Sequence, residues 1–270
     1  MKIRSFGKTD IGKRRERNED AYLINDERSI YIIADGMGGH LGGEFASNFA
    51  VKTINDVFES LEDDPESTLP EGANLKTGDY AGALRYAISV ACRKIYEKAQ
   101  EDPALKGMGT TTVAAVFRNN KVYIANVGDS RVYQIRGKKI SQITKDHSLV
   151  GEQIRAGLIS ADDSRAHKLK NIITRSVGFQ EEVDSDIDIR IVKKGDIYLL
   201  CSDGLSNMVE DHEIYDVVIN NDLQGAAQKL VDIANERGGD DNITLILIEI
   251  LDLDSLPSRS VSDESTIDIG

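Results

Sequence analysis

Cysteine and histidine are scarce in this sequence, which contains 2 cysteines and 4 histidines in 270 residues. Cys92 lies in a helical pattern and Cys201 ends an apolar strand, and their spacing matches no zinc site. We therefore expect two reduced, buried thiols in place of a zinc centre.

Long apolar stretches are also missing. The longest, such as Ile243 to Ile250, are far shorter than the ~20 residues that a membrane-spanning helix requires. The first residues, Met1 to Asp10, lack the apolar core of a signal peptide. These absences predict a cytoplasmic protein with no membrane partner.

Positive charge is in deficit, because 33 lysines and arginines face 46 aspartates and glutamates, giving a formal net charge of -13. A surface of this sign repels a phosphate backbone, so nucleic acid is not an expected partner. An acidic excess by itself indicates only solubility. The functional argument therefore depends on where particular aspartates lie.

Short segments rich in β-branched residues and bounded by turn formers predict strands. They are Ala21 to Asn25, Ser29 to Ala34, Thr111 to Phe117, Val122 to Val127, Val132 to Ile135, Ile197 to Cys201 and Ile243 to Ile250. Several are apolar at nearly every position, as expected of sheets covered on both faces. Apolar residues at helical spacing predict helices over Gly43 to Leu61, Tyr80 to Gln100 and Gln224 to Ala234. Strands and helices come in blocks, which favours a layered α+β domain.

Polar segments interrupt and follow these elements. Glu62 to Asp79 is rich in Asp, Glu, Pro and Gly and predicts a surface loop. Leu149 to Lys170 has weak helical periodicity and predicts a mobile, irregular element over the domain. Residues 251–270 are mostly Ser, Asp, Glu and Pro, which predicts a disordered tail.

Several predicted strands end in an aspartate beside a glycine. Asp35-Gly36, Asp203-Gly204 and Gly128-Asp129 follow strands, and Asp241-Asn242 precedes the last one. Taken singly, each pair is most simply a turn, since Asp and Gly are common turn formers. Taken together, the carboxylates would repel one another and have raised pKa values unless a cation neutralised them.

An all-oxygen set of ligands selects hard cations, Mg²⁺ or Mn²⁺, over zinc or copper. The glycines that follow Asp35 would let a backbone carbonyl or amide approach such an ion closely. Two ions about 4 Å apart can share a bridging water and orient it for in-line attack on phosphorus. The pattern therefore indicates a phosphoester hydrolase.

The order of the motifs resembles the PP2C-like, or PPM, protein phosphatases in their compact bacterial form. The matching stretches are Arg15-Glu16-Arg17-Asn18-Glu19-Asp20, Asp35-Gly36-Met37-Gly38-Gly39-His40, Gly109-Thr110-Thr111, Gly128-Asp129-Ser130-Arg131, Asp146-His147-Ser148, Thr174-Arg175-Ser176-Val177-Gly178, Ser202-Asp203-Gly204-Leu205 and Asp241-Asn242. The resemblance implies a catalytic domain over residues 1–250, with a flap at about residues 149–170. It also implies a four-layer α-β-β-α sandwich with two central antiparallel sheets.

The resemblance further implies two bound Mn²⁺ or Mg²⁺ ions and a weaker third. Asp35 would bridge the first two ions. The Gly36 carbonyl would bind the second ion, and Asp203 and Asp241 would complete the first.

Other positions match residues that act around these ions. Glu19 and Asp20 would hold waters of the second ion. Asp129 would share the third ion with Asp203, although Asp129 on its own could equally cap a turn. Arg15 would bind the phosphate through a planar guanidinium, which can donate two parallel hydrogen bonds. The alternative for Arg15 is a solvated charge in a basic run.

The general acid is open. Animal-type members have a histidine two residues after the bridging aspartate, where this chain has Met37. His40 is near enough to act as the acid, but a histidine in a glycine-rich turn can also be structural. His147 precedes a helical stretch and is interpreted as part of a capping turn.

The implied activity is hydrolysis of phosphoserine and phosphothreonine in proteins, by a monomer that opposes a bacterial serine/threonine kinase and has that kinase among its substrates. A catalytically silent regulatory module is an alternative, although such members normally lose aspartates that this chain keeps. A regulator that dephosphorylates a sigma-factor antagonist is a third hypothesis. Such proteins usually carry sensor domains or membrane segments, and the sequence suggests neither.

Overall fold

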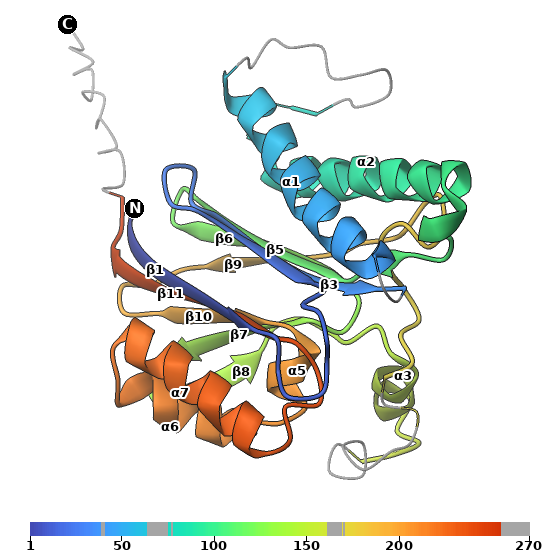
Figure 1. Cartoon of the computed structure of the whole chain (residues 1–270). Coiled ribbons are helices and arrows are strands. Elements are labelled where there is room, and N and C mark those ends of the chain that lie inside the picture. The colour runs from blue at the N-terminus through green and yellow to red at the C-terminus, as the bar shows by residue number, and fades with distance from the viewer. Residues whose placement is uncertain (39–40, 64–74, 77, 161–168, 170, 255–270) are drawn as a thin grey trace, which may run out of the picture.

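Two antiparallel β-sheets lie face to face between two layers of helices (Figure 1). The computed structural model describes residues 1–38, 41–63, 75–76, 78–160, 169 and 171–254. Helices α1 (Gly42–Asp63) and α2 (Tyr80–Glu101) cover one outer face, and α6 (Asp211–Ile219) and α7 (Leu223–Glu236) cover the other. The predicted four-layer sandwich is confirmed.

The first sheet pairs the two ends of the described chain. Its strand order is β1-β11-β10-β7-β8. The strands are β1 (Lys2–Asp10), β7 (Arg131–Arg136), β8 (Lys139–Gln142), β10 (Ile197–Cys201) and β11 (Ile243–Asp252). Asp10 at the end of β1 lies opposite Ile243 at the start of β11. This register brings the loop after β1 beside Asp241.

The second sheet has the strand order β2-β3-β5-β6-β9, and β4 pairs with β3. Its strands are β2 (Asp20–Asn25), β3 (Ile30–Met37), β4 (Gly109–Thr110), β5 (Thr112–Arg118), β6 (Lys121–Val127) and β9 (Asp186–Ile191). Asp20 and Asp35 are direct partners on the neighbouring strands β2 and β3. The register of this pair therefore places two of the predicted site carboxylates side by side.

The strands are apolar on both faces because each sheet is covered on both faces. In β3, Ile32 packs in the cluster under α1 and α2, whereas Tyr31 packs in the cluster between the sheets. The Tyr31 ring lies edge-on to Phe117, with centroids 5.7 Å apart, and Phe117 meets Tyr198 of the other sheet at 5.3 Å. Removing a buried ring of this kind typically costs about 3–5 kcal/mol of stability.

Every predicted strand and helix is present, with ends that differ by a few residues at most. Strands β1, β4, β8 and β9 and the helices α5 (Asp203–Ser206) and α6 were not predicted from the sequence. Strand β9 lies at a sheet edge with Ile189 and Ile191 exposed, so it has no buried apolar run for a pattern to detect. Helix α6 is short, and a capping box between Glu210 and Glu213 defines its start.

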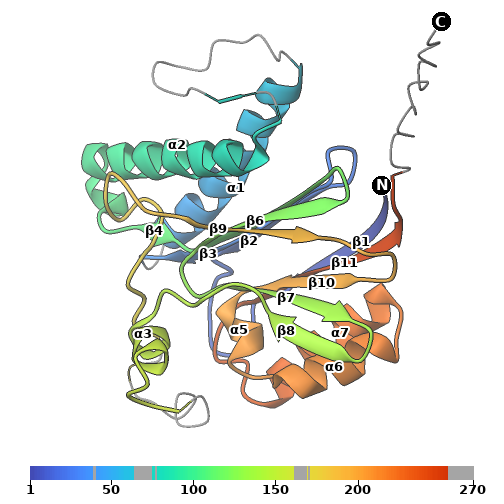
Figure 2. The ribbon, with the colours of Figure 1, turned by 180° about the vertical axis from the view of Figure 1, so that it is seen from behind.

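The predicted polar segments are described only in part. Helix α1 continues to Asp63, and residues 64–74 and 77 lie outside the described ranges. The segment at 149–170 begins with helix α3 (Leu149–Arg155), which stands beyond the ends of both sheets (Figure 2), and residues 161–168 and 170 are not described. Strand β11 extends past Ile250 to Asp252, while residues 255–270 lie outside. Among the described helices, none combines the length and apolar character needed to cross a membrane.

Candidate metal centre

A cluster of aspartates from distant parts of the sequence gathers at one end of the two sheets. Burial raises the pKa of Asp35 well above its ordinary value, and neighbouring carboxylates raise it further. These neighbours are Asp20, Asp203, Asp129 and Asp241. Carboxylates that destabilise one another in this way are neutralised either by protons or by a cation.

Asp20 is a buried member of the cluster and accepts a side-chain hydrogen bond. It opens β2, is 8% exposed, and accepts a hydrogen bond at Oδ2 from the Ser202 hydroxyl at 2.8 Å. The Ser202 oxygen in turn accepts the backbone N–H of Thr244 at 3.0 Å. Burial, with a smaller contribution from the negative charges of Asp203 and Asp241, raises the pKa of Asp20 to about 7 despite the hydrogen bond from Ser202.

Asp203 opens helix α5 directly after strand β10. Its Oδ2 accepts a hydrogen bond from the Asn207 amide at 3.0 Å. Burial first, and then Asp241, raises the pKa of Asp203 to about 6. The other carboxylate oxygens, Asp203 Oδ1 and Asp20 Oδ1, are buried and accept no hydrogen bond from the described residues. Two buried acceptors with no donor in the described ranges are suitable ligands for a hard cation.

Gly36 lies where three segments converge, and only glycine fits there. A Cβ atom on Gly36 would lie 2.1 Å from the carbonyl oxygen of Gly43 and 2.6 Å from that of Glu19. A Cβ on Gly43 would lie 2.3 Å from Glu19 Oε2. The backbone N–H of Gly36 donates to the Glu19 carbonyl at 3.1 Å. The close packing places the Glu19 carboxylate and the Gly36 main chain together, as the predicted second-ion site requires.

The Asn242 side chain anchors the loop that carries Arg15 and Glu19. Its Oδ1 accepts the Glu19 backbone N–H at 2.8 Å, and its Nδ2 donates to the carbonyls of Ile11 and Arg17, each at 2.9 Å. The residue is 4% exposed, and the amide uses its acceptor and both donor hydrogens. Asn242 belongs to the Asp241-Asn242 motif, but its anchoring role is not predictable from the sequence.

The Arg15 side chain extends from this loop to Asp241, the residue before Asn242. Its Nη2 donates to Asp241 Oδ2 at 2.6 Å, and this hydrogen bond raises the pKa of the guanidinium. The Arg15 side chain is 52% exposed, so most of the guanidinium can still reach a ligand. The two predicted site residues therefore meet, although they lie near opposite ends of the sequence.

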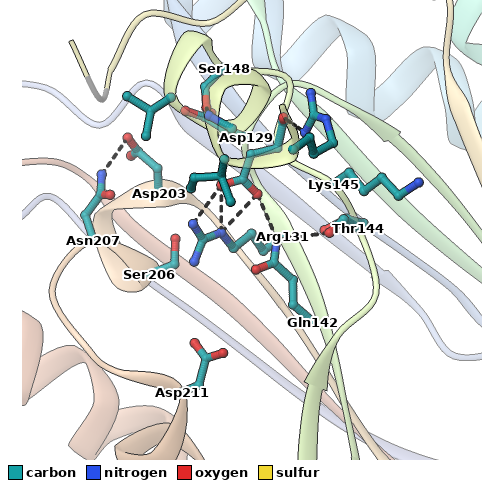
Figure 3. A pocket seen from close by; sticks show the side chains of 15 residues that line it. Asp129, Arg131, Gln142, Thr144, Lys145, Ser148, Asp203, Ser206, Asn207 and Asp211 are labelled. Carbon is teal, nitrogen blue, oxygen red and sulfur yellow. Dashed lines mark hydrogen bonds and ion pairs between the residues drawn. The ribbon is translucent and has the colours of Figure 1, made fainter. Parts of the chain in front are cut away.

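Asp129 lies just after β6 and close to Asp203. It is 8% exposed, and burial together with Asp203 raises its pKa well above the ordinary value. Asp129 and Asp203 both line a cavity of about 420 Å³ that also includes Ser148, and Figure 3 shows Asp203 bound to Asn207 on its wall. The Arg131 guanidinium faces Asp146, with Nη2 to Oδ2 at 2.7 Å. Asp129 thus keeps its carboxylate toward Asp203 and the cavity.

His40, the residue considered as a general acid, lies outside the described residues, while Met37 ends β3 opposite Gly109. In the described ranges, no three histidine, cysteine or carboxylate side chains are arranged to hold an ion by themselves. The three carboxylates predicted for the first ion, Asp35, Asp203 and Asp241, lie near enough for Asp241 to raise the pKa of the other two, but among the described residues they do not form such a group. Both cysteines are buried and unpaired, as expected.

Comparison with known proteins agrees with the resemblance seen in the sequence. A family model described as protein phosphatase 2C matches residues 11–243. The chain is 39% identical over 246 residues to the serine/threonine phosphatase stp of Listeria welshimeri, covering 90% of this chain and 94% of the relative. It is similar to the crystal structure of the Staphylococcus aureus phosphatase Stp1, with a TM-score of 0.82, 34% identity, and coverage of 93% and 96% of the two chains.

A further solved structure bears on the metal. The catalytic domain of a serine/threonine protein phosphatase, PstP, in complex with 2 manganese ions is 31% identical to this chain. The similarity has a TM-score of 0.79 and covers 93% of this chain and 99% of PstP. The relative thus holds two ions of the kind that the oxygen ligands here suit.

Proposed function

Because this chain belongs to the protein phosphatase 2C family and is a serine/threonine protein phosphatase, we propose that its aspartate cluster binds two Mn²⁺ or Mg²⁺ ions and a weaker third. The substrates are phosphoproteins. The observation that carries the metal proposal is the pair of buried oxygens, Asp20 Oδ1 and Asp203 Oδ1, which accept no hydrogen bond from the described residues. An ion at Asp203 Oδ1 and a water of an ion at Asp20 Oδ1 would satisfy both oxygens.

The proposal assigns the ligands by position. Asp35, the Gly36 carbonyl, Asp203 and Asp241 would hold the first two ions, and Glu19 and Asp20 would accept hydrogen bonds from water at the second. Asp129 and Asp203 would hold the third ion. When bound, such ions lower the pKa of a bound water and neutralise charge on the phosphoryl oxygens.

The residues of the chain bind and orient the phosphoester. The Arg15 guanidinium can donate two parallel hydrogen bonds to phosphate oxygens, and its exposed surface leaves room for them. Asn242 keeps Arg15 in reach by fixing the backbone of its loop at Ile11, Arg17 and Glu19. Met37 cannot donate a proton, so His40 is proposed as the general acid for the departing serine or threonine oxygen.

Turnover of p-nitrophenyl phosphate and of a phosphothreonine peptide with Mn²⁺, with and without EDTA, tests the proposal. We expect activity that EDTA abolishes and that Asp35→Asn removes. Asp232→Asn, which changes an exposed carboxylate on α7, is the matched control and keeps full activity. A protein that binds two Mn²⁺ ions by metal analysis but turns over neither substrate would instead support the silent regulatory module.

We further propose that the protein acts as a cytoplasmic monomer, with residues 1–250 as the catalytic domain, and reverses the action of a serine/threonine kinase. The acidic net charge of -13 and the names of the relatives support phosphoprotein substrates over nucleic acid. Phosphoproteomics of a strain lacking the gene tests this role. Accumulated phosphosites on a kinase and its targets are expected, whereas accumulation confined to a sigma-factor antagonist would favour the dedicated regulator.

A further inference from the structure

We infer that His147 is a positioning residue that fixes the Gly128-Asp129 turn and links it to the base of the segment that carries α3. The inference rests on the proposed function in one respect, namely that Asp129 holds the third ion. His147 is 2% exposed and lies directly before Ser148, the N-cap of α3. The sequence alone indicated no more than a capping turn at this residue.

His147 and Gly128 form a reciprocal pair of hydrogen bonds. The backbone N–H of His147 donates to the Gly128 carbonyl at 2.8 Å, and the backbone N–H of Gly128 donates to the ring nitrogen Nδ1 at 3.2 Å. A backbone N–H can only donate, so Nδ1 carries no proton and the ring proton is on Nε2. The ring therefore holds the Val127–Gly128 peptide, and the His147 backbone N–H holds the next peptide, which leads into Asp129.

The turn needs such support because of its backbone conformation. Gly128 has a φ of +104°, and a Cβ there would lie 2.6 Å from Thr111 Cβ, so no larger residue could stiffen the turn. Glycine leaves the peptide free to move unless neighbouring groups hold it. His147 supplies hydrogen bonds to both the N–H and the carbonyl of this residue.

The opposite edge of the ring contacts β9. Nε2 lies 3.3 Å from Asp186 Oδ2 and 3.4 Å from Arg175 Nη1, which donates to Asp186 Oδ1 at 3.1 Å. With its proton on Nε2, the ring donates to Asp186 and accepts nothing from Arg175 at that nitrogen. Burial lowers the pKa of His147, although Asp186 partly opposes this, which agrees with a neutral ring. The ring thus bridges the Asp129 turn and the Asp186–Arg175 ion pair.

The main chain of His147 belongs to the base of the α3 segment. Its carbonyl accepts the Thr174 N–H at 2.8 Å, and the Leu149 N–H donates to the Ile172 carbonyl at 2.8 Å. Ser148 and Ile173 form an isolated β-bridge between these hydrogen bonds. A shift of this base would therefore move His147 and, through Nδ1, the turn that carries Asp129.

Two conservative substitutions separate positioning from a purely structural role. Asn places an acceptor oxygen near the site of Nδ1, so His147→Asn can keep the bond from Gly128 and lose the contact with Asp186. Gln places a donor near the site of Nε2, so His147→Gln does the reverse. His212→Gln is the matched control, because His212 is exposed and contacts only Glu210 among the ion pairs described.

Calorimetric titration with Mn²⁺ and the Mn²⁺ concentration for half-maximal activity are the metal readouts. Loss of an outer hydrogen-bond partner typically weakens metal binding by about 10–100-fold. We expect His147→Gln to weaken binding of the third Mn²⁺ ion by about tenfold, while two ions stay tightly bound. His147→Asn and His212→Gln should change the affinity for the third ion little. Equal shifts for Asn and Gln, or lower melting temperatures with unchanged Mn²⁺ binding in both, would overturn the inference.

A readout without metal keeps the inference separate from the third-ion assignment. In the EDTA-treated protein, ring nitrogen chemical shifts should show the Nε2–H form, and the Gly128 amide should exchange faster in His147→Gln than in His147→Asn. If Asp129→Ala leaves Mn²⁺ binding unchanged, the third-ion assignment fails and these metal-free readouts decide on His147. Equal exchange in both variants, or an Nδ1–H ring, would then reject the positioning role. In the Asp129→Ala background, His147→Gln should cause no further loss of Mn²⁺ binding.

Discussion

Arg15 and Asp241 are joined by a hydrogen bond of 2.6 Å from guanidinium Nη2 to carboxylate Oδ2. The first is the proposed phosphate ligand and the second a proposed metal ligand. The contact holds the guanidinium at the edge of the aspartate cluster, and its positive charge partly neutralises the negative charge of the cluster. A phosphate bound here would meet Arg15 already oriented by Asp241, the carboxylate proposed to bind the ion.

Arg15→Lys should raise KM for phosphoesters with a smaller effect on kcat, since the charge remains but the forked geometry is lost. Loss of one hydrogen bond to a charged group is worth about 1.5–3 kcal/mol, or at least about tenfold in KM. Steady-state kinetics check this, with Arg14→Lys as control because Arg14 is exposed and 3.9 Å from Asp240. A large fall in kcat at unchanged KM would instead assign Arg15 to the transition state.

Asp203→Asn should nearly abolish activity, because an amide cannot neutralise the charge of an ion. The loss should exceed the roughly 10–100-fold that is typical of residues that only orient a ligand. Single-turnover assays with measured Mn²⁺ content provide the test. Near-normal turnover would remove Asp203 from the site.

Asp129→Ala should cut turnover strongly while two ions stay bound and the fold is unchanged, because only the weaker third site loses a ligand. A mere turn residue would behave differently. It would lower the melting temperature by the few degrees expected of about 1 kcal/mol, with kcat little changed. Melting temperature, metal content and kcat measured on one preparation distinguish the two roles.

The pKa of Asp20, raised from 3.8 to about 7, makes the metal-free protein sensitive to pH. Between these values the folded state binds a proton that the unfolded chain releases, so stability falls as the pH rises through this window. In EDTA, Asp20 should therefore stabilise the protein and raise its melting temperature when the pH is lowered from about 7 towards 4. Asp20→Asn should flatten this dependence, and an identical pH profile for both proteins would show that Asp20 does not cause it.

Asn242→Ala should affect stability and substrate binding together. It leaves the Glu19 N–H and the carbonyls of Ile11 and Arg17 without their partner, which costs about 1–3 kcal/mol where such groups are buried. We expect a lower free energy of unfolding in denaturant titrations and a raised KM, because the Arg15 loop is released. Asn48→Ala, on the exposed side of α1, is the control. A destabilised variant with unchanged KM would limit Asn242 to the fold.

The sequence predicted the layers because buried strands such as β3 and β11 have apolar residues on both faces. It did not predict β1 or β9, since an edge strand with an exposed face carries mixed residues that resemble a loop. The aspartates predicted at strand ends do lie close together, since Asp20, Asp203, Asp129 and Asp241 all raise the pKa of Asp35. The supports, Asn242 and Ser202, escaped prediction because their partners lie 182 or more residues away in the sequence.

The pairing of β1 with β11 also makes assembly of the site depend on residues from both ends of the described chain. Arg15, Glu19 and Asp20 are made early in translation, yet the groups that hold them in place, Ser202 and Asn242, come late. Contacts of such long sequence separation form slowly and only when both partners exist. A chain that stops before Asn242 and β11 therefore lacks the groups that hold the Arg15 loop and the strand that pairs with β1.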